Sequence, residues 1–95
     1  MKDISFWIVS YDVKDNKRRI RVAKELKNYG HRVQYSVFEC LLSVDKAEQL
    51  KEKLEKLVLK NEDSIRFYRL CEGCKKRIFI FGQGRVTDDE DVYII

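Results

Sequence analysis

The sequence predicts a small, single-domain α+β protein. The chain has 95 residues, which is too few for two independent cores. Two amphipathic helical segments lie among short apolar segments of strand character. A hydrophobic fraction of 44%, with 12% aromatic residues, suffices for a packed core and excludes a wholly disordered chain.

The first third of the chain predicts a strand followed by a helix. The apolar run over residues 4–11 indicates a buried strand, and apolar residues at helical spacing predict a helix over residues 17–29. Asp15 or Asn16 is expected to cap this helix, because a short oxygen-bearing side chain accepts hydrogen bonds from its free amides. Gly30 is expected to follow the helix with a positive φ.

The middle of the chain predicts a strand region and a second helix. Residues 32–42 predict a strand that alternates at first and loses the alternation at Phe38, so the segment 32–44 is either one bent strand or a hairpin. An apolar stripe predicts a helix over residues 45–60. Asp45 and Glu48 have a capping-box arrangement, with Asp in place of the usual Ser or Thr.

The last third is expected to be mainly β. Residues 61–64 form a turn, and a strand follows over residues 65–70. Residues 71–74 are expected to be a hairpin loop before another strand at 77–81, and residues 91–95 would supply a short fifth strand. Periodicity alone does not decide whether the order is the ferredoxin-like β-α-β-β-α-β.

Two apolar features bear on where the protein is expected, a membrane-spanning stretch and a signal peptide. No stretch approaches the roughly 20 apolar residues that span a bilayer. The start of the chain also lacks the apolar region of a signal peptide. We therefore expect a cytoplasmic protein with reduced cysteines. Cys71 and Cys74 have zinc-knuckle spacing, but only Cys40 remains as a further thiol, so we expect no zinc site.

Charge is distributed unevenly along the chain. The net charge is +4, and residues 88–91 are all acidic. A concentration of cations between residues 14 and 32 suits a surface that faces a polyanion, although a solvated helix face would have the same composition. These cations are Lys14, Lys17, Arg18, Arg19, Arg21, Lys24, Lys27 and Arg32.

A carboxylate stands at the end of the first predicted strand. Asp12 directly follows a run of apolar residues, and a buried or half-buried carboxylate is costly unless it is paired or bound to a metal. The basic helix that follows suggests a polyanion as the object of its chemistry. The alternative is an Asp that caps the loop or the first helix.

Several of these motifs occur together in one known family. A strand ending in Tyr-Asp, a basic helix, Tyr-Gly and then Arg-Val-Gln-x-Ser-Val-Phe-Glu follow one another in order. In this order the chain resembles the small CRISPR-associated "Cas-two" proteins, from residue 4 to about residue 84. The matching segments are residues 8–13, 18–19, 22–24, 26, 29–30, 32–39, 64–68 and 70–71.

The resemblance implies a fold and an assembly. Family members have a ferredoxin-like β-α-β-β-α-β domain and form symmetric homodimers. We therefore expect residues 1–95 to be one such domain, with residues 85–95 as a C-terminal segment that pairs with the partner subunit. The resemblance also implies two partners: RNA or double-stranded DNA, and the CRISPR integrase "Cas-one".

The resemblance also assigns roles to individual residues. Asp12 matches the family's catalytic and metal-binding Asp, and Mg²⁺ or Mn²⁺ suits its hard oxygen ligands. Arg18, Arg19 and Arg32 match basic positions that would bind phosphates of the nucleic acid. Residues expected to support the active site or the dimer interface are Tyr11, Ser36 and Phe38.

Two functional hypotheses follow. The first is a Mg²⁺-dependent endonuclease, an endoribonuclease or an endodeoxyribonuclease, which uses one Asp12 from each subunit of a dimer. Such a pair is a sparse site, so its activity would be weak. The second is a non-catalytic scaffold that holds nucleic acid and docks the integrase during spacer acquisition. We expect the scaffold to be the physiological role.

Overall fold

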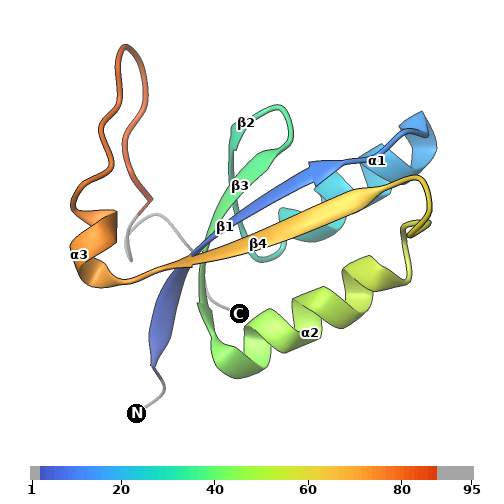
Figure 1. Ribbon diagram of the computed structural model, residues 1–95, viewed down its shortest axis with the longest axis horizontal. Helices are drawn as coiled ribbons and strands as arrows, with labels where there is room; N and C mark the ends of the chain where they lie inside the picture. The colour runs from blue at the N-terminus through green and yellow to red at the C-terminus, as the bar shows by residue number, and fades with distance from the viewer. Residues whose placement is uncertain (1–2, 88–95) are drawn as a thin grey trace.

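The fold is a four-stranded antiparallel sheet with two long helices packed against one face (Figure 1). The computed structural model describes residues 3–87, and the strand order across the sheet is β2-β3-β1-β4. This is the β-α-β-β-α-β order of a ferredoxin-like domain, as expected. The elements are β1 (Ile4–Asp12), α1 (Asn16–Leu26), β2 (Gly30–Gln34), β3 (Val37–Ser43), α2 (Val44–Glu55), β4 (Ser64–Leu70) and α3 (Glu72–Lys75).

Strand β1 lies in the middle of the sheet and pairs on both sides. Its register with β4 places Asp12 opposite Ser64, and its register with β3 places Ser10 opposite Val37. Since successive side chains of a strand point to opposite faces, alternate residues of β1 face the helices. Hydrogen bonding to β3 and β4 together extends over the whole length of β1, and Asp12 is its last residue.

The core lies between the sheet and the two long helices. Val9 of β1 and Phe38 of β3 are fully buried, as are Leu26 of α1 and Leu50 and Leu54 of α2. All five belong to one apolar cluster. The apolar stripes predicted for the two helices therefore face the sheet.

The two long helices begin at different kinds of cap. The Asp15 side chain accepts a hydrogen bond from the Arg18 backbone N–H at 3.0 Å, which confirms the predicted cap of α1. For α2 the prediction was wrong: Ser43, not Asp45, is the cap, and its Oγ accepts from Lys46 N–H at 3.2 Å. Asp45 lies in the first turn instead, where its charge complements the helix dipole.

Gly30 has a role other than the predicted one. It is not among the positive-φ glycines, which are Gly82 and Gly84. Gly30 begins β2 against β3, and a Cβ there would collide with the Glu39 carbonyl oxygen and the Cys40 sulfur. Close packing of the two strands, and not a left-handed turn, therefore requires glycine at this position.

The segment 32–42, left open by the sequence, is a hairpin. Strands β2 and β3 pair antiparallel and are joined by a turn at Tyr35 and Ser36, with an irregularity between Arg32 and Gln34. The turn lies near the end of β1, because the Tyr11 backbone N–H donates to the Ser36 carbonyl oxygen at 3.0 Å. The hairpin supplies the strand that periodicity could not assign.

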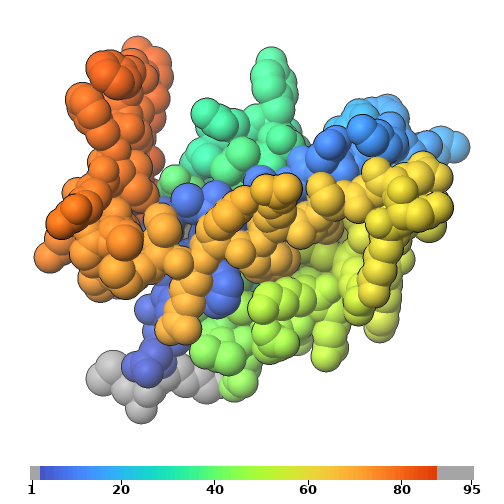
Figure 2. Space-filling view, in the orientation of Figure 1, coloured from blue at the N-terminus to red at the C-terminus, as the bar shows by residue number. Residues whose placement is uncertain are grey.

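The chain after β4 differs from the prediction. Residues 72–75 form the short helix α3 where a hairpin loop was expected, and residues 77–81 form no strand. An apolar run becomes a strand only where a sheet edge is available to it, and Phe79 and Phe81 remain 76% and 87% exposed. Figures 1 and 2 show this segment standing away from the sheet, in orange to red.

Two further expectations bear on the ends of the chain and on membranes. The predicted fifth strand at 91–95 lies outside the described residues, as does most of the segment 85–95. Among residues 3–87, no helix is both long enough and apolar enough to cross a membrane.

Candidate functional site

A hollow of about 370 Å³ lies at the end of β1, where this strand, α1 and the β2–β3 hairpin meet. It brings together residues that are far apart in the sequence. Five of the predicted site residues line it, and two, Arg18 and Phe38, do not. The lining residues are Tyr11, Asp12, Val13, Arg19, Ile20, Ala23, Arg32, Tyr35 and Ser36.

Asp12 is exposed at the rim of this hollow. Its side chain is 73% exposed, and Oδ2 lies 3.8 Å from Nζ of Lys14. The premise that Asp12 is buried or half-buried was therefore wrong, because Asp12 pairs with β4 alone, past the end of the β1–β3 register, and its carboxylate reaches solvent. Since water screens an exposed ion pair of this length, Lys14 holds the carboxylate only weakly.

Tyr11 joins the end of β1 to the hairpin. Its ring is buried and tilted against Phe38, with ring centroids 6.3 Å apart, and its hydroxyl donates to the Tyr35 carbonyl oxygen at 3.1 Å. Phe38 is completely buried and belongs to the core. Tyr11 lines the hollow with Phe38 packed against its ring, and Ser36 lines the hollow from the turn.

The two arginines of the hollow are held in different ways. Arg19 donates from Nε and Nη2 to the Val13 carbonyl oxygen, at 3.1 and 3.0 Å, and from Nη1 to Asn16 Oδ1 at 2.9 Å. Its guanidinium thus fixes the loop after Asp12. Arg32 stacks over the Phe38 ring at 5.5 Å and donates to the Tyr11 hydroxyl at 3.5 Å. Arg32 is therefore the less engaged cation.

Arg18 lies outside the hollow and is bound within the chain. Its Nε donates to Asp63 Oδ2 at 2.8 Å, and its Nη2 donates to Asp63 Oδ1 at 3.1 Å and to Glu62 at 3.2 Å. A bidentate pair of this kind occupies the donors that would bind phosphate. Binding of nucleic acid by Arg18 stays a prediction, and the geometry gives Arg18 a positioning role.

Asp63 is the functional residue that sequence reasoning missed. Its side chain has no exposed surface and accepts from the backbone N–H groups of Lys14 and Leu59, at 3.0 and 2.9 Å, besides Arg18. The Arg18 guanidinium, followed by these amides, holds the pKa of the Asp63 carboxyl well below its usual range. A turn residue just before a strand gives no sequence signal of this role.

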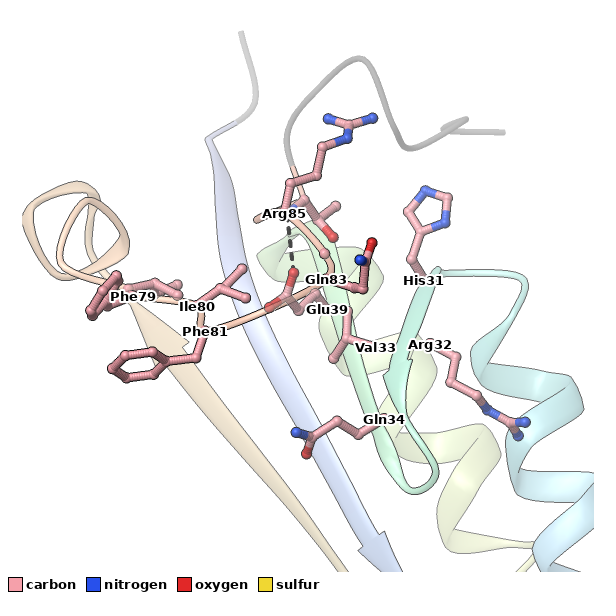
Figure 3. Close-up of a pocket in the computed structure, with 13 residues that line it drawn as sticks. His31, Arg32, Val33, Gln34, Glu39, Phe79, Ile80, Phe81, Gln83 and Arg85 are labelled. Atoms are coloured by element: carbon pink, nitrogen blue, oxygen red, sulfur yellow. Dashed lines mark hydrogen bonds between the residues drawn. The ribbon is translucent and has the colours of Figure 1, made fainter.

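A second hollow, of about 640 Å³, separates the hairpin from the segment after α3 (Figure 3). Figure 2 shows it between the green and orange-red regions. His31 lines this hollow and not the one beside Asp12. The buried Glu39 accepts from the Thr87 backbone N–H at 3.0 Å, which holds the returning chain against β3. Arg32 extends away from Phe79 and Phe81, toward α1.

The Asp12 carboxylate is the right type of ligand for a hard cation, but the chain offers too few such ligands there. Carboxylate oxygens are ligands that Mg²⁺ and Mn²⁺ prefer, and Mg²⁺ is often held by one or two carboxylates together with waters and phosphate. Within residues 3–87, no three His, Cys, Asp or Glu side chains are grouped so that they could hold a metal ion. One chain therefore offers Asp12 as a single acidic ligand.

Comparisons with known proteins agree with the fold. Residues 5–78 match the family model described as CRISPR associated protein Cas2. The chain is 44% identical over 92 residues to the CRISPR-associated endoribonuclease Cas2 1 of Chloroflexus aurantiacus. That alignment covers 95% of this chain and 99% of the relative.

Two solved structures are similar to most of the chain. The crystal structure of Streptococcus pyogenes Cas2 has a TM-score of 0.73 and 36% identity, and covers 81% of this chain and 99% of that one. A chain of a partial Cas6-RT-Cas1–Cas2 complex has a TM-score of 0.71 and 31% identity, covering 80% and 89%. Because a family model and a close relative both span most of its length, this chain belongs to the CRISPR-associated Cas2 family.

Proposed function

We propose that this protein is a metal-dependent endonuclease of the CRISPR adaptation stage, which hydrolyses phosphodiester bonds of RNA or double-stranded DNA. The observation that carries the proposal is the placement of Asp12, Arg19 and Arg32 around one hollow. Asp12, an acid suited to a hard cation, lies there beside Arg32, a cation suited to phosphate, while Arg19 fixes the loop after Asp12. The name endoribonuclease, given to the Chloroflexus relative, supports the same activity.

The chemistry follows from what each group can do. Asp12 would hold Mg²⁺ or Mn²⁺, which when bound neutralises phosphate charge and lowers the pKa of an attacking water. Arg32 would bind a phosphate oxygen, because its guanidinium is stacked on Phe38 and retains free donors. Tyr35, 94% exposed at the tip of the hairpin, would stack on a base.

We propose further that the active form is a homodimer in which two copies of Asp12 face each other. A single carboxylate per chain leaves the ligand set short, and a second copy would double it without any further residue of this chain. The expected activity is weak, since two exposed carboxylates form a sparse site.

The endonuclease proposal is tested by Asp12→Asn. We expect Mg²⁺-dependent cleavage of RNA or duplex DNA to fall by about 100-fold or more, because even groups that only orient metal ligands cost 10–100-fold when removed. The matched control is Asp3→Asn, which neutralises an exposed carboxylate before the other end of the same strand. Equal cleavage by wild type and Asp12→Asn would exclude Asp12 as the catalytic acid.

A second candidate function is a nucleic-acid scaffold that docks the integrase Cas1. The exposed Arg21 and Lys24 of α1, and Lys27 directly after it, form no ion pair with any residue between 3 and 87, so they are available to phosphates. The Cas1–Cas2 complex named for one structural relative supports such a partner.

Spacer acquisition separates the two functions. If the scaffold is the physiological role, Asp12→Asn acquires spacers normally, whereas loss of the α1 cations stops acquisition. Acquisition that fails with Asp12→Asn in a stable, DNA-binding protein would mean that cleavage is required.

A further inference from the structure

Two cysteines lie together where the chain leaves the sheet. Cys71 directly follows β4 and caps the short helix α3, and Cys74 lies within that helix. Both are exposed, and the Cys74 backbone N–H donates to the Cys71 sulfur at 3.4 Å. The proposed nuclease and scaffold functions make no use of either thiol.

The two thiols differ in their electrostatic surroundings. The backbone N–H of Cys74, followed by its thiol, lowers the pKa of Cys71, whereas the neighbouring Cys71 raises the pKa of Cys74. The basic residues Lys75, Lys76 and Arg77 follow at once. An exposed thiol that accepts hydrogen bonds from neighbouring N–H groups is a typical nucleophile, and its neighbour is then the resolving thiol.

Cys40 provides a contrast within the same chain. It is completely buried in β3, and burial, with a smaller effect of Glu39, raises its pKa to about 12. A thiol in such surroundings is unreactive. Any thiol chemistry of the folded protein is therefore confined to Cys71 and Cys74.

We propose that Cys71 and Cys74 are a redox-active dithiol that low-molecular-weight disulfides convert reversibly into an intrachain disulfide. The Cys71 thiolate attacks one sulfur of the small disulfide, and the other sulfur leaves as a thiolate. Cys74 then loses its proton and attacks the Cys71 sulfur, which releases the second small thiol. Two protein thiols are oxidised, and one small disulfide is reduced to two thiols.

Zinc is the other occupant that this spacing suggests, and the geometry favours it less. A structural zinc site takes four ligands, and this pair supplies two. No grouping of three metal-ligating side chains occurs within the described part of the chain. A disulfide needs only the two sulfurs, which one turn of α3 holds near each other.

The disulfide would act on the segment that follows it. Helix α3 is the base from which residues 77–87 extend (Figure 1). A bond between Cys71 and Cys74 would fix this turn and so the direction in which Phe79 and Phe81 are presented. The redox state of the dithiol would thus set the orientation of the exposed segment independently of Asp12.

The test uses full-length reduced protein, its Cys71→Ser and Cys74→Ser variants, and mixtures of oxidised and reduced glutathione. Thiols are trapped by a maleimide reagent under native conditions and located by peptide mass spectrometry. Wild type should lose both exposed thiols and become lighter by two hydrogen atoms while remaining a single chain. The Cys74→Ser variant should become glutathionylated on Cys71 and keep this adduct, because it lacks the resolving thiol. Its rate of glutathionylation should be at least about threefold higher than that of Cys71→Ser on Cys74.

Cys40 is the internal control, since it should stay unmodified in every sample that remains folded. Equal rates for the two single variants would overturn the assignment of Cys71 as the nucleophile. A disulfide between two chains, or glutathione that accumulates on wild type without ring closure, would overturn the intrachain dithiol. Zinc bound stoichiometrically by wild type, with both thiols protected, would do the same.

Discussion

At the scale of single residues, the Asp63 carboxylate holds the loop beside the Asp12 hollow in place. Its two oxygens accept four hydrogen bonds, which come from the Arg18 side chain and from the backbones of Lys14 and Leu59. These donors lie in α1 and the loop before it and in the segment after α2, more than forty residues apart. The position of Asp12 therefore depends on a residue that is not in the hollow.

Asp63→Asn is expected to lower the Tm near neutral pH by several degrees, because an amide oxygen cannot replace two charged acceptors. The folded-state pKa of Asp63 is depressed, so its contribution to stability is present above the unfolded pKa of about 3.9. The contribution is lost as the pH falls from there toward the folded-state pKa.

Thermal unfolding of wild type and Asp63→Asn at pH 7 and in strong acid measures this effect. The difference in Tm should narrow as the pH is lowered, whereas Asp3→Asn should follow wild type throughout. A difference in Tm that is the same at every pH would refute the assigned role of the Asp63 charge.

At the scale of elements, helix α1 has three surfaces with different roles. Val22 and Leu26 pack in the core, and Arg19 faces the hollow. Lys17, Arg21 and Lys24 follow one another at i, i+4 and i+7 and are exposed, so they share one outer face of the helix. We expect phosphate binding at this outer stripe, because Arg18 and Arg19 use their donors within the chain.

Replacing Lys17, Arg21 and Lys24 by Gln should lower the affinity for duplex DNA. It should also make that affinity less dependent on the salt concentration. Three lost phosphate contacts should reduce the slope of log K against log salt by about 2.7. Binding titrations at several salt concentrations measure this slope.

The control for that variant changes the net charge equally but removes cations that already have partners. Lys51, Lys53 and Lys60 lie within 4 Å of Glu48, Glu25 and Glu55, at 2.9, 3.9 and 2.7 Å. Their replacement by Gln should leave the slope nearly unchanged. If both triple variants lose the same slope, net charge and not the α1 stripe attracts the nucleic acid.

At the scale of the whole molecule, the segment after α3 leaves a large apolar surface uncovered. The Phe79 and Phe81 rings lie 4.7 Å apart and are 76% and 87% exposed. Figure 2 shows this segment projecting beyond the body of the domain. An exposed aromatic pair of this kind is typical of an association surface, which agrees with the proposed homodimer.

The double variant Phe79→Ser/Phe81→Ser is expected to raise the dimer dissociation constant by at least about tenfold, because buried aromatic anchors dominate most interfaces. Sedimentation or light scattering over a range of concentrations measures this constant. Val44→Ser is the control, since Val44 is 54% exposed but lies on α2. An unchanged dissociation constant in the double variant would place the interface elsewhere.

Features that depend on residues close to one another in the sequence were predicted correctly in most cases. The apolar run of β1, the stripes of α1 and α2 and the Asp15 cap were all predicted, because each follows from local spacing and local hydrogen bonds. The sequence also placed Asp12 at the end of a strand. Local patterns were ambiguous for the β2–β3 hairpin, and they misplaced the α2 cap, which a strand residue supplies.

Other features depend on contacts between residues far apart in the chain, and these became visible in the folded structure. The fold brings Asp63 to Arg18 across 45 residues, and no local pattern predicted this pair. Residues 77–81 have the composition of a strand, but pairing requires an edge that no pattern within the segment specifies. The exposure of Asp12 was decided in the same way. The exposure of this residue depends on whether neighbouring segments of the chain cover the end of β1. They do not, and its carboxylate is open to solvent.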